Sequence, residues 1–211
     1  MDQAENRVDP RITASRRRVL TAALTELAEA GYGGFAIESV CRRSGVAKST
    51  VYRHWPGKLA LIADALRSLN VQPGSAADPL SDLTPRQRVV AIVDHLATAF
   101  TGSLVADCTP ALIDAAERND ELRELFHRYN AERRATLVAA VRDGIAAGDF
   151  PSGADPELAA TALAGAVIYR RLMTPDALDP TEVDDLVDTV LGPGVSQSPS
   201  PRRRLGEATR E

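Results

Sequence analysis

The 211-residue sequence predicts an all-α fold, with a small N-terminal helical domain followed by a larger C-terminal helical domain. Two observations predict this fold class. Apolar residues recur at helical spacings along most of the chain, and no segment shows the alternation that is typical of a half-buried strand. Helix starts are also marked repeatedly, because Thr84, Asp155 and Asp179 each stand directly before a proline. Such a residue can cap a helix whose first position is proline.

The N-terminal region is expected to hold four helices that are separated by breaks. The first begins with Thr13 as its N-cap and ends at Gly31, because glycine readily adopts the left-handed conformation that ends helices. Gly45 then separates two short helices, and a Pro-Gly pair ends the second of them. These three later helices are expected over residues 37–44, 48–55 and 58–70.

The C-terminal region is expected to hold five helices after a linker over residues 71–79, which contains two prolines. Thr109 and Pro110 mark the start of a short helix, and Gly148 ends the longest one. The expected ranges are 85–101, 109–116, 120–147, 156–173 and 180–191. From Pro193 the chain is rich in Pro and Ser and carries three consecutive arginines, which indicates a disordered basic tail over residues 193–211.

Composition excludes several classes of protein. The hydrophobic share of 44% is too high for a disordered chain. No segment approaches the roughly 20 apolar residues of a membrane-spanning helix, and the polar N-terminus lacks the apolar stretch of a secretory signal. The two cysteines, Cys41 and Cys108, cannot by themselves build a disulfide framework or a four-ligand zinc site. We therefore expect a cytoplasmic protein with no membrane contact and no cofactor.

Charge is distributed unevenly along the chain. Residues 1–70 carry 11 basic and 7 acidic side chains, whereas residues 71–211 carry 14 basic and 22 acidic ones. A basic region in an acidic protein is one indication of nucleic-acid binding. A chance imbalance of solvated surface charge would explain the difference equally well, so charge alone does not decide the function.

The segment 37–55 has the features of a helix-turn-helix. Gly45 can supply the tight turn, and Val40, Val46 and Val51 can form an apolar plug between the two short helices. The second helix then presents side chains that form hydrogen bonds, which suits the base edges and phosphates of DNA. These candidate DNA-binding residues are Lys48, Ser49, Thr50, Tyr52, Arg53 and His54.

The run GVAKSTVYRHWPGKLALIADAL resembles the signature of TetR-family (tetracycline-repressor-type) transcriptional regulators. That family places a Gly-Val turn before the recognition helix, then a tyrosine, an aromatic residue at the helix end and a lysine that opens the next helix. The residues at those places are Gly45, Val46, Tyr52, Trp55 and Lys58. The resemblance implies that Lys58 contacts a phosphate of the DNA.

The resemblance also implies an overall organisation and a mechanism. A helix-turn-helix domain over residues 1–57 would precede a regulatory and dimerisation domain over residues 58–192. The protein would be a homodimeric repressor that binds a pseudo-palindromic, double-stranded DNA operator and is released by a small-molecule inducer. In one departure, Ala36 stands where the family usually has Thr or Ser, and alanine has no hydroxyl for the cap and the phosphate contact that the family makes there.

Two helices are candidates for the dimer interface. The small residues Ala159, Ala160, Ala162, Ala164, Gly165 and Ala166 would let two copies of one helix approach closely. The last helix has an apolar stripe that could pair with its own copy, although the stripe could instead pack within one chain. The stripe consists of Val183, Leu186, Val187, Val190 and Leu191.

A ligand pocket is expected in the C-terminal domain, because several aromatic and apolar residues fall on apolar helix faces there. Tyrosine hydroxyls would offer hydrogen bonds, and Arg133 could orient an anionic or polar ligand. Ordinary core packing would explain each residue separately. The candidate ligand-binding residues are Phe100, Leu112, Phe126, Tyr129, Arg133 and Tyr169.

Catalysis is not expected from this sequence. His54, His95 and His127 lie far apart, and none has Cys or a carboxylate at a metal-ligand spacing. No phosphate-binding glycine loop follows a strand, and no catalytic triad is recognisable. The alternative to a DNA-binding regulator is a helical ligand-binding or adaptor protein that does not bind DNA.

Overall fold

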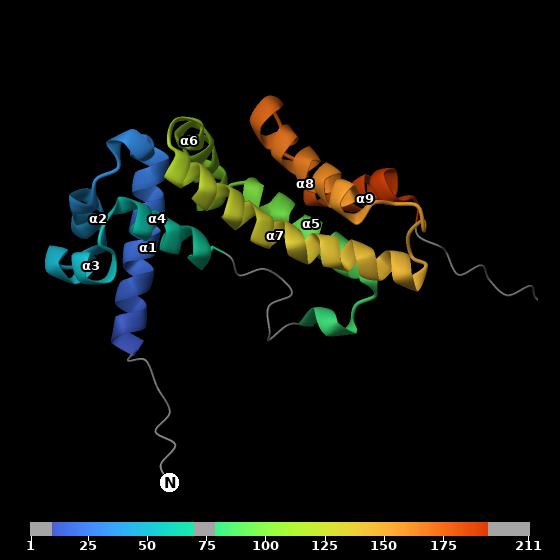
Figure 1. Ribbon diagram of the computed structural model, residues 1–211, viewed down its shortest axis with the longest axis horizontal. Helices are drawn as coiled ribbons and strands as arrows, with labels where there is room; N and C mark the ends of the chain where they lie inside the picture. The colour runs from blue at the N-terminus through green and yellow to red at the C-terminus, as the bar shows by residue number, and fades with distance from the viewer. Residues whose placement is uncertain (1–9, 70–78, 194–211) are drawn as a thin grey trace, which may run out of the picture.

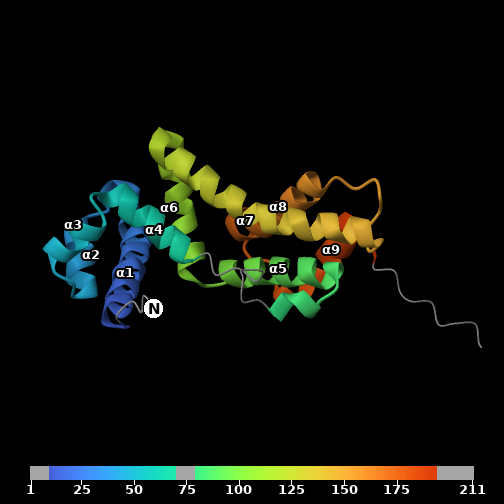
Figure 2. The same cartoon turned by 60° about the horizontal axis from the view of Figure 1, so that its bottom comes forward.

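The computed structural model describes residues 10–69 and 79–193, and these residues form nine α-helices, two short 3-10 helices and no strand. The predicted all-α fold class is therefore confirmed. Most of the expected linker and nearly all of the expected basic tail lie outside the described residues. The molecule is elongated, with α1–α4 at one end and α5, α8 and α9 toward the other (Figures 1 and 2).

The N-terminal helices agree closely with the expected ranges except at the start of the first one. α1 begins at Pro10, so Thr13 lies inside the helix and is not its N-cap. Proline is favoured at a first helical position, because an N–H there has no partner within the helix. Gly31 breaks the helical conformation as expected, with φ 66° and ψ 175°. The four helices are α1 (Pro10–Gly34), α2 (Ile37–Ser44), α3 (Lys48–His54) and α4 (Lys58–Ser68).

The turn between α2 and α3 is that of a helix-turn-helix. Gly45 adopts the left-handed conformation, with φ 68° and ψ 20°, and its N–H donates to the carbonyl oxygen of Cys41 at 3.0 Å. Val40 on α2 and Val51 on α3 are both completely buried. Glycine avoids the steric penalty that a side chain meets in this conformation, so the turn can bring the two short helices together.

The start of α2 lacks a side-chain cap. Ala36 occupies the N-cap position in an extended conformation, and no side chain accepts a hydrogen bond from the first turn. We expect Ala36→Ser to stabilise the protein by about 1 kcal/mol, because serine can accept from a backbone N–H that alanine leaves without a side-chain partner. Thermal unfolding should show a rise of about 2–4 °C for a chain of this size.

The matched control for this substitution is Ala36→Val, which adds side-chain volume but no acceptor and should not stabilise the protein. An equal rise in melting temperature for both variants would contradict the capping explanation. A stabilised serine variant that also binds DNA more tightly would indicate that residue 36 reaches a phosphate, as the family resemblance implies for Thr or Ser.

Two of the C-terminal α-helices, α5 and α8, begin where the sequence places their caps, and Asp179 caps a 3-10 helix that leads into α9, so the helix expected from residue 180 is α-helical only from Val183. Thr84 forms a complete capping box with Gln87, and the carboxylates of Asp155 and Asp179 accept from backbone N–H groups of the following turns. Gly148 ends the longest helix in the left-handed conformation. The helices are α5 (Pro85–Phe100), α6 (Leu104–Arg118), α7 (Asp120–Ala147), α8 (Pro156–Met173) and α9 (Val183–Leu191); the 3-10 helices are Pro79–Asp82 and Pro180–Glu182.

α6 begins five residues earlier than expected, so the prediction of a helix opened by Thr109 and Pro110 is wrong. Ser103 is the N-cap, and its hydroxyl oxygen accepts from the N–H of Val105 at 3.1 Å. Pro110 lies inside the helix with its ring exposed. The Thr109 hydroxyl donates to the carbonyl oxygen of Val105 at 2.7 Å, one turn back in the same helix, so Thr109 does not cap a helix start. The Thr109-Pro110 pair therefore marks no helix start, because Ser103 caps the same helix upstream.

The hydrophobic core consists of two clusters that are joined by α7. The first contains the buried residues of α1–α4 together with Cys108 and Leu112 of α6 and Leu122 and Leu125 of α7. The second contains buried residues of α5, of the other half of α7, and of α8 and α9. The helix-turn-helix therefore packs directly on α6 and on the first half of α7, which runs along both parts of the molecule (Figure 1).

Candidate DNA interface and ligand cavity

The six candidate DNA-binding residues of α3 lie at one end of the molecule (Figures 1 and 2). Val51, within the helix, and Trp55, just after it, are buried and hold the helix against the core. This anchor leaves the rest of the short helix available to a partner. Of the six, Thr50 is half-buried, and the exposed ones are Lys48, Ser49, Tyr52, Arg53 and His54.

Lys48 is held by contacts that are fully exposed to solvent. Its ammonium lies 2.5 Å from the Glu38 carboxylate and 5.5 Å from the centre of the Tyr52 ring. The hydrogen bond from Lys48 lowers the pKa of Glu38, and the same hydrogen bond raises the pKa of Lys48. Exposed ion pairs contribute little to stability. Lys48 can therefore exchange Glu38 for a base or phosphate of DNA at a small free-energy cost.

Asp64 of α4 connects three helices at the base of the recognition helix. Its carboxylate accepts from Trp55 Nε1–H at 2.9 Å and from Arg16 of α1 at 2.9 and 2.7 Å. Arg67 lies 3.8 Å away. Burial alone would raise the pKa of Asp64, but the hydrogen bonds from Arg16 and Trp55 and the two nearby guanidinium charges lower it. Sequence reasoning missed this residue, because Asp64 appears as an ordinary polar position of an amphipathic helix.

Lys58 opens α4 as the sequence indicated, but its ammonium is turned toward the end of α1. It donates to the carbonyl oxygen of Tyr32 at 3.1 Å and lies 4.0 Å from the centre of the Tyr32 ring. Burial, and secondarily the charge of Glu121, raise the pKa of Tyr32, so this phenol is neutral near pH 7. Lys58 thus ties α4 to α1, and two of its three N–H groups remain for another acceptor.

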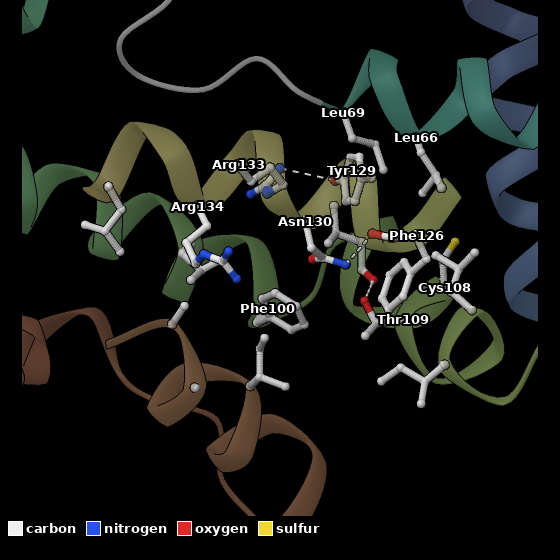
Figure 3. Close-up of a pocket in the computed structure, with 18 of the residues that line it drawn as sticks. Leu66, Leu69, Phe100, Cys108, Thr109, Phe126, Tyr129, Asn130, Arg133 and Arg134 are labelled. Carbon is white, nitrogen blue, oxygen red and sulfur yellow. Dashed lines mark hydrogen bonds between the residues drawn. The ribbon is translucent and has the colours of Figure 1, made fainter. Parts of the chain in front are cut away.

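A cavity of about 330 Å³ lies among α4, α5, α6, α7 and α8 (Figure 3). Five of the six candidate ligand-binding residues line it, and they come from three different helices. Leu66 of α4 and Leu69, the C-cap residue of that helix, line it as well, although sequence reasoning did not include them. Nothing in the sequence separates these two leucines from the other apolar positions of α4. The five expected lining residues are Phe100, Leu112, Phe126, Tyr129 and Arg133.

The placement of Tyr169 in the cavity was wrong. α8 presents Thr161, Ala164 and Ile168 to the cavity, whereas Tyr169 does not line the cavity and is 61% exposed. Successive helical residues point about 100° apart, so the residue next to a lining position leaves the cavity. Its hydroxyl is therefore not available to a ligand in this cavity.

Two polar side chains of the cavity wall donate hydrogen bonds within α7. Arg133 donates to the Tyr129 hydroxyl at 3.2 Å, and the Asn130 amide donates to the Phe126 carbonyl oxygen at 2.8 Å (Figure 3). Burial raises the pKa of Tyr129. Burial lowers the pKa of His95, and the positive charge of Arg133 lowers it further.

The apolar stripe expected at the dimer interface packs largely within its own chain. Val183, Val187 and Leu191 of α9 are buried in the second core cluster, as are Ala159 and Ala160 of α8. The remaining stripe residues, Leu186 and Val190, are half-buried. Periodicity shows which residues share a helix face, but it does not show which neighbour covers that face.

A different apolar face of α8 is exposed. Leu158, Tyr169 and Met173 are 69, 61 and 70% exposed, and the small residues Ala162 and Gly165 lie exposed between them. Spacings of three and four residues place these side chains on one side of the helix. This exposed α8 face, defined by these five residues, is an apolar surface that the other described helices of the chain leave uncovered.

The described residues offer no evident metal site and no single membrane-spanning helix. No group of three or more His, Cys, Asp or Glu side chains is close enough there to hold a metal ion. No single described helix is long and apolar enough to cross a membrane, and α5 and α6 reach that length and hydropathy only when they are taken together across a bend of 79°.

Comparisons with known proteins match both parts of the chain. Residues 19–65 match the family "Bacterial regulatory proteins, tetR family", and residues 83–190 match "Tetracyclin repressor-like, C-terminal domain". The uncharacterised HTH-type transcriptional regulator YdeS of Bacillus subtilis is 28% identical over 181 residues, which cover 84% of this chain and 88% of YdeS. The DNA-binding transcriptional repressor TetR of Mycobacteroides abscessus is 26% identical over 174 residues, covering 82 and 90% of the two chains.

The fold is also similar to that of solved structures. The structure of Salmonella enterica GusR superposes with a TM-score of 0.68 and 21% identity, and the match covers 87% of this chain and 97% of GusR. At this identity the likeness concerns the fold. It extends over the helix-turn-helix and the C-terminal helices alike.

Proposed function

Since the chain belongs to the TetR family of transcriptional regulators, we propose that it is a dimeric repressor that releases its DNA operator when a small molecule fills the cavity. The observation that carries this proposal is the exposed, hydrogen-bonding face of α3 above the buried anchors Val51 and Trp55. A repressor of this kind would act on DNA in the cytoplasm and would need no catalytic step.

The proposed DNA contacts follow from the chemistry of each side chain. Lys48 and Thr50 would reach base edges, and Tyr52, His54 and Lys58 would contact phosphates, with Ser49 and Arg53 alongside. Base contacts supply sequence preference, whereas phosphate contacts supply affinity that depends on salt.

A selection from genomic fragments followed by a gel-shift assay tests DNA binding directly. A regulator should retain a small set of fragments that share a pseudo-palindrome, because a two-fold dimer reads two related half-sites. Retention of no fragment, or of all fragments equally, would favour the alternative of a helical ligand-binding or adaptor protein.

The exposed α8 face is the proposed dimer interface, and it replaces the α9 stripe as the surface to test. Tyr169→Asp should shift the protein toward monomers in sedimentation velocity, because a carboxylate buried between two α8 helices would lack a counter-charge. Several kcal/mol of lost association energy would weaken the dimer more than about 100-fold. Val187→Asp would instead disrupt the core of one chain, since Val187 is fully buried there.

Ile12→Asp is the matched control for the dimer test. Ile12 is an exposed apolar residue of α1, far from α8 along the chain, and its replacement should leave the dimer intact. An unchanged dimer in the Tyr169 variant, or equal dissociation of both variants, would show that another surface joins the two chains.

α4 offers a physical route from the cavity to the recognition helix. Its C-terminal part lines the cavity through Leu66 and Leu69, and its Asp64 accepts a hydrogen bond from Trp55 at the end of α3. A ligand that pushes on the two leucines would move the carboxylate that holds α3. To shift the dimer from 1:99 to 99:1 between its two states, the ligand must prefer one state by about 5.5 kcal/mol.

A further inference from the structure

The charged side chains among the described residues that line the cavity are all positive. None of its described lining residues is Asp or Glu, whereas Arg133 and Arg134 contribute two guanidinium groups and His95 contributes an imidazole. Arg134 also pairs with Glu157 at 3.4 Å, so part of its charge is neutralised. The rest of the wall is apolar, with a few uncharged polar groups. A partly enclosed, low-dielectric space lined in this way favours a negatively charged guest over a positively charged one.

We propose that the cavity binds an amphipathic organic carboxylate, and that His95 takes up a proton as this ligand binds. This inference rests on the proposed function, because it names the chemical class of the effector for the same cavity. The apolar body of the ligand would contact Leu66, Leu69, Phe100 and Leu112, and the carboxylate would face Arg133.

The size of the cavity limits the ligand. Its volume is about 330 Å³, roughly twice the ~150 Å³ of an apolar cavity that holds benzene. The cavity therefore accommodates on the order of a dozen non-hydrogen atoms. Decanoate and phenyl-substituted short-chain acids have this size, and each places a long apolar body behind one carboxylate.

Arg133 is built into the cavity wall in a defined position. Its guanidinium donates to the Tyr129 hydroxyl and lies 5.5 Å from the centre of the Tyr129 ring, and the Asn130 side chain lies close by in the same stretch of α7 (Figure 3). Guanidinium is weakly hydrated and its planar shape matches that of a carboxylate, so it suits this role better than an ammonium group would.

His95 is the group of the cavity wall that can take up a proton near neutral pH. The other titratable or charged side chains of the described wall are Tyr129, Arg133 and Arg134 of α7 and Cys108 of α6, and Asp94 neighbours His95 on its own helix. α4 and α8 contribute no titratable side chain to the described cavity wall. Burial raises the pKa of Cys108 to about 12 and raises the pKa of Tyr129 above its usual value, so both stay neutral between about pH 5 and 8.

The direction of the pH effect follows from the difference in the pKa of His95 between the empty and the occupied cavity. In the empty cavity, burial first and then Arg133 lower the pKa of His95, while Asp94 partly opposes them, so the imidazole is neutral at pH 7. A carboxylate in the cavity favours the imidazolium form and raises this pKa. Binding therefore takes up a proton, and affinity rises as the pH falls from the pKa of the complex toward the pKa of the empty protein.

Titration calorimetry on the full-length protein tests the ligand class with three matched probes: decanoate, decan-1-ol and decylamine. Decanoate should bind at least about tenfold more tightly than the alcohol, because hydrogen bonds to charged groups contribute about 1.5 kcal/mol or more. Decylamine, which is protonated below about pH 10, should bind most weakly. Decanoate should also bind about three- to tenfold more tightly near pH 6 than near pH 8, with proton uptake visible in buffers of different ionisation heat.

Two pairs of variants assign the effect to the proposed residues. Arg133→Gln should lower the affinity for decanoate about tenfold and leave that for decan-1-ol unchanged, whereas Arg128→Gln, an exposed control on the same helix, should change neither. His95→Gln should abolish the proton uptake and the pH dependence. His127→Gln removes an exposed histidine of α7 and should preserve both.

Equal binding of acid and alcohol, tighter binding of the amine, or binding of no probe would overturn the carboxylate assignment. Retained proton uptake in the His95 variant would overturn the role of that histidine. The comparison of the three probes on the unaltered protein does not depend on how the variants fold. A gel-shift assay on the same preparation separates the two proposals. Operator binding without decanoate binding would support the proposed regulator function and refute only the proposed ligand class.

Discussion

Asp64→Ala is expected to reduce operator affinity and to destabilise the helix-turn-helix at the same time. The substitution removes the acceptor of the buried Trp55 N–H and the partner of Arg16, which together hold the end of α3 against α1 and α4. A buried donor that is left unpaired costs about 1–3 kcal/mol. Chemical denaturation should show this loss, and operator affinity should fall about tenfold, because a displaced recognition helix no longer fits the major groove.

Two control variants separate the roles of Asp64. Asp64→Asn keeps an acceptor for Trp55 but loses the charge, so it should lie between the alanine variant and the unaltered protein. Asp114→Ala removes a carboxylate whose pair with Arg118 is exposed, and it should change stability by less than about 0.5 kcal/mol. Normal stability and operator binding in the Asp64→Ala variant would show that the Trp55 hydrogen bond does not position α3.

The Asp64 interaction also has an expected pH dependence. The pKa of Asp64 is lowered in the folded protein, so its stabilising contribution is fully present above the unfolded value of about 3.9. The contribution is lost as the pH falls through the lower pKa of the folded state. The difference in stability between the unaltered protein and Asp64→Asn should therefore be constant near neutral pH and shrink below about pH 4.

Thr50→Ala and Lys58→Ala are expected to weaken DNA binding in two distinguishable ways. A lost base contact costs on the order of 1 kcal/mol in each half-site, and a dimer has two half-sites. Thr50→Ala should therefore weaken binding to the selected operator roughly 30-fold and leave binding to random DNA nearly unchanged. Lys58→Ala should weaken binding to every sequence and reduce the salt slope by about one for each chain.

Fluorescence anisotropy on operator and random duplexes over a range of salt concentrations measures both effects. Equal losses on both duplexes for Thr50→Ala would contradict a base contact. For Lys58→Ala the second observable is the melting temperature, because Lys58 also holds Tyr32 of α1. A lowered melting temperature with an unchanged salt slope would make Lys58 an anchor of α1 and not a phosphate ligand.

Local signals in the sequence were sufficient for most of the helices and for the recognition face. Thr84, Asp155 and Asp179 cap helices through contacts with residues only two or three positions away, so their role is visible in the sequence. Gly45 likewise marks a turn whose conformation depends on the backbone of one residue. The polar side chains of α3 could be identified because a helix this short docks through only a few apolar residues.

The C-terminal domain shows where local signals were insufficient. Aromatic content and apolar periodicity identified four residues that line the cavity, beside Arg133, which was selected for its charge, but they also selected Tyr169, which lies on the exposed α8 face. The same periodicity offered the α9 stripe as a dimer surface, although Val187 is buried in its own chain. Apolar patterning reports that a face is covered, and the identity of the covering partner depends on how the helices pack.

Long-range contacts were decided by the tertiary structure alone. Asp64 meets Arg16 across 48 residues, and Lys58 meets Tyr32 across 26, and neither pairing has a periodic signature. The same packing brings Leu66 and Leu69 of α4 to the cavity wall and so connects it with Trp55. The sequence by itself thus determined the helices, their caps and the chemistry of the recognition face. Packing determined the connection between cavity and DNA interface, because that connection depends on side chains from separate helices meeting in space.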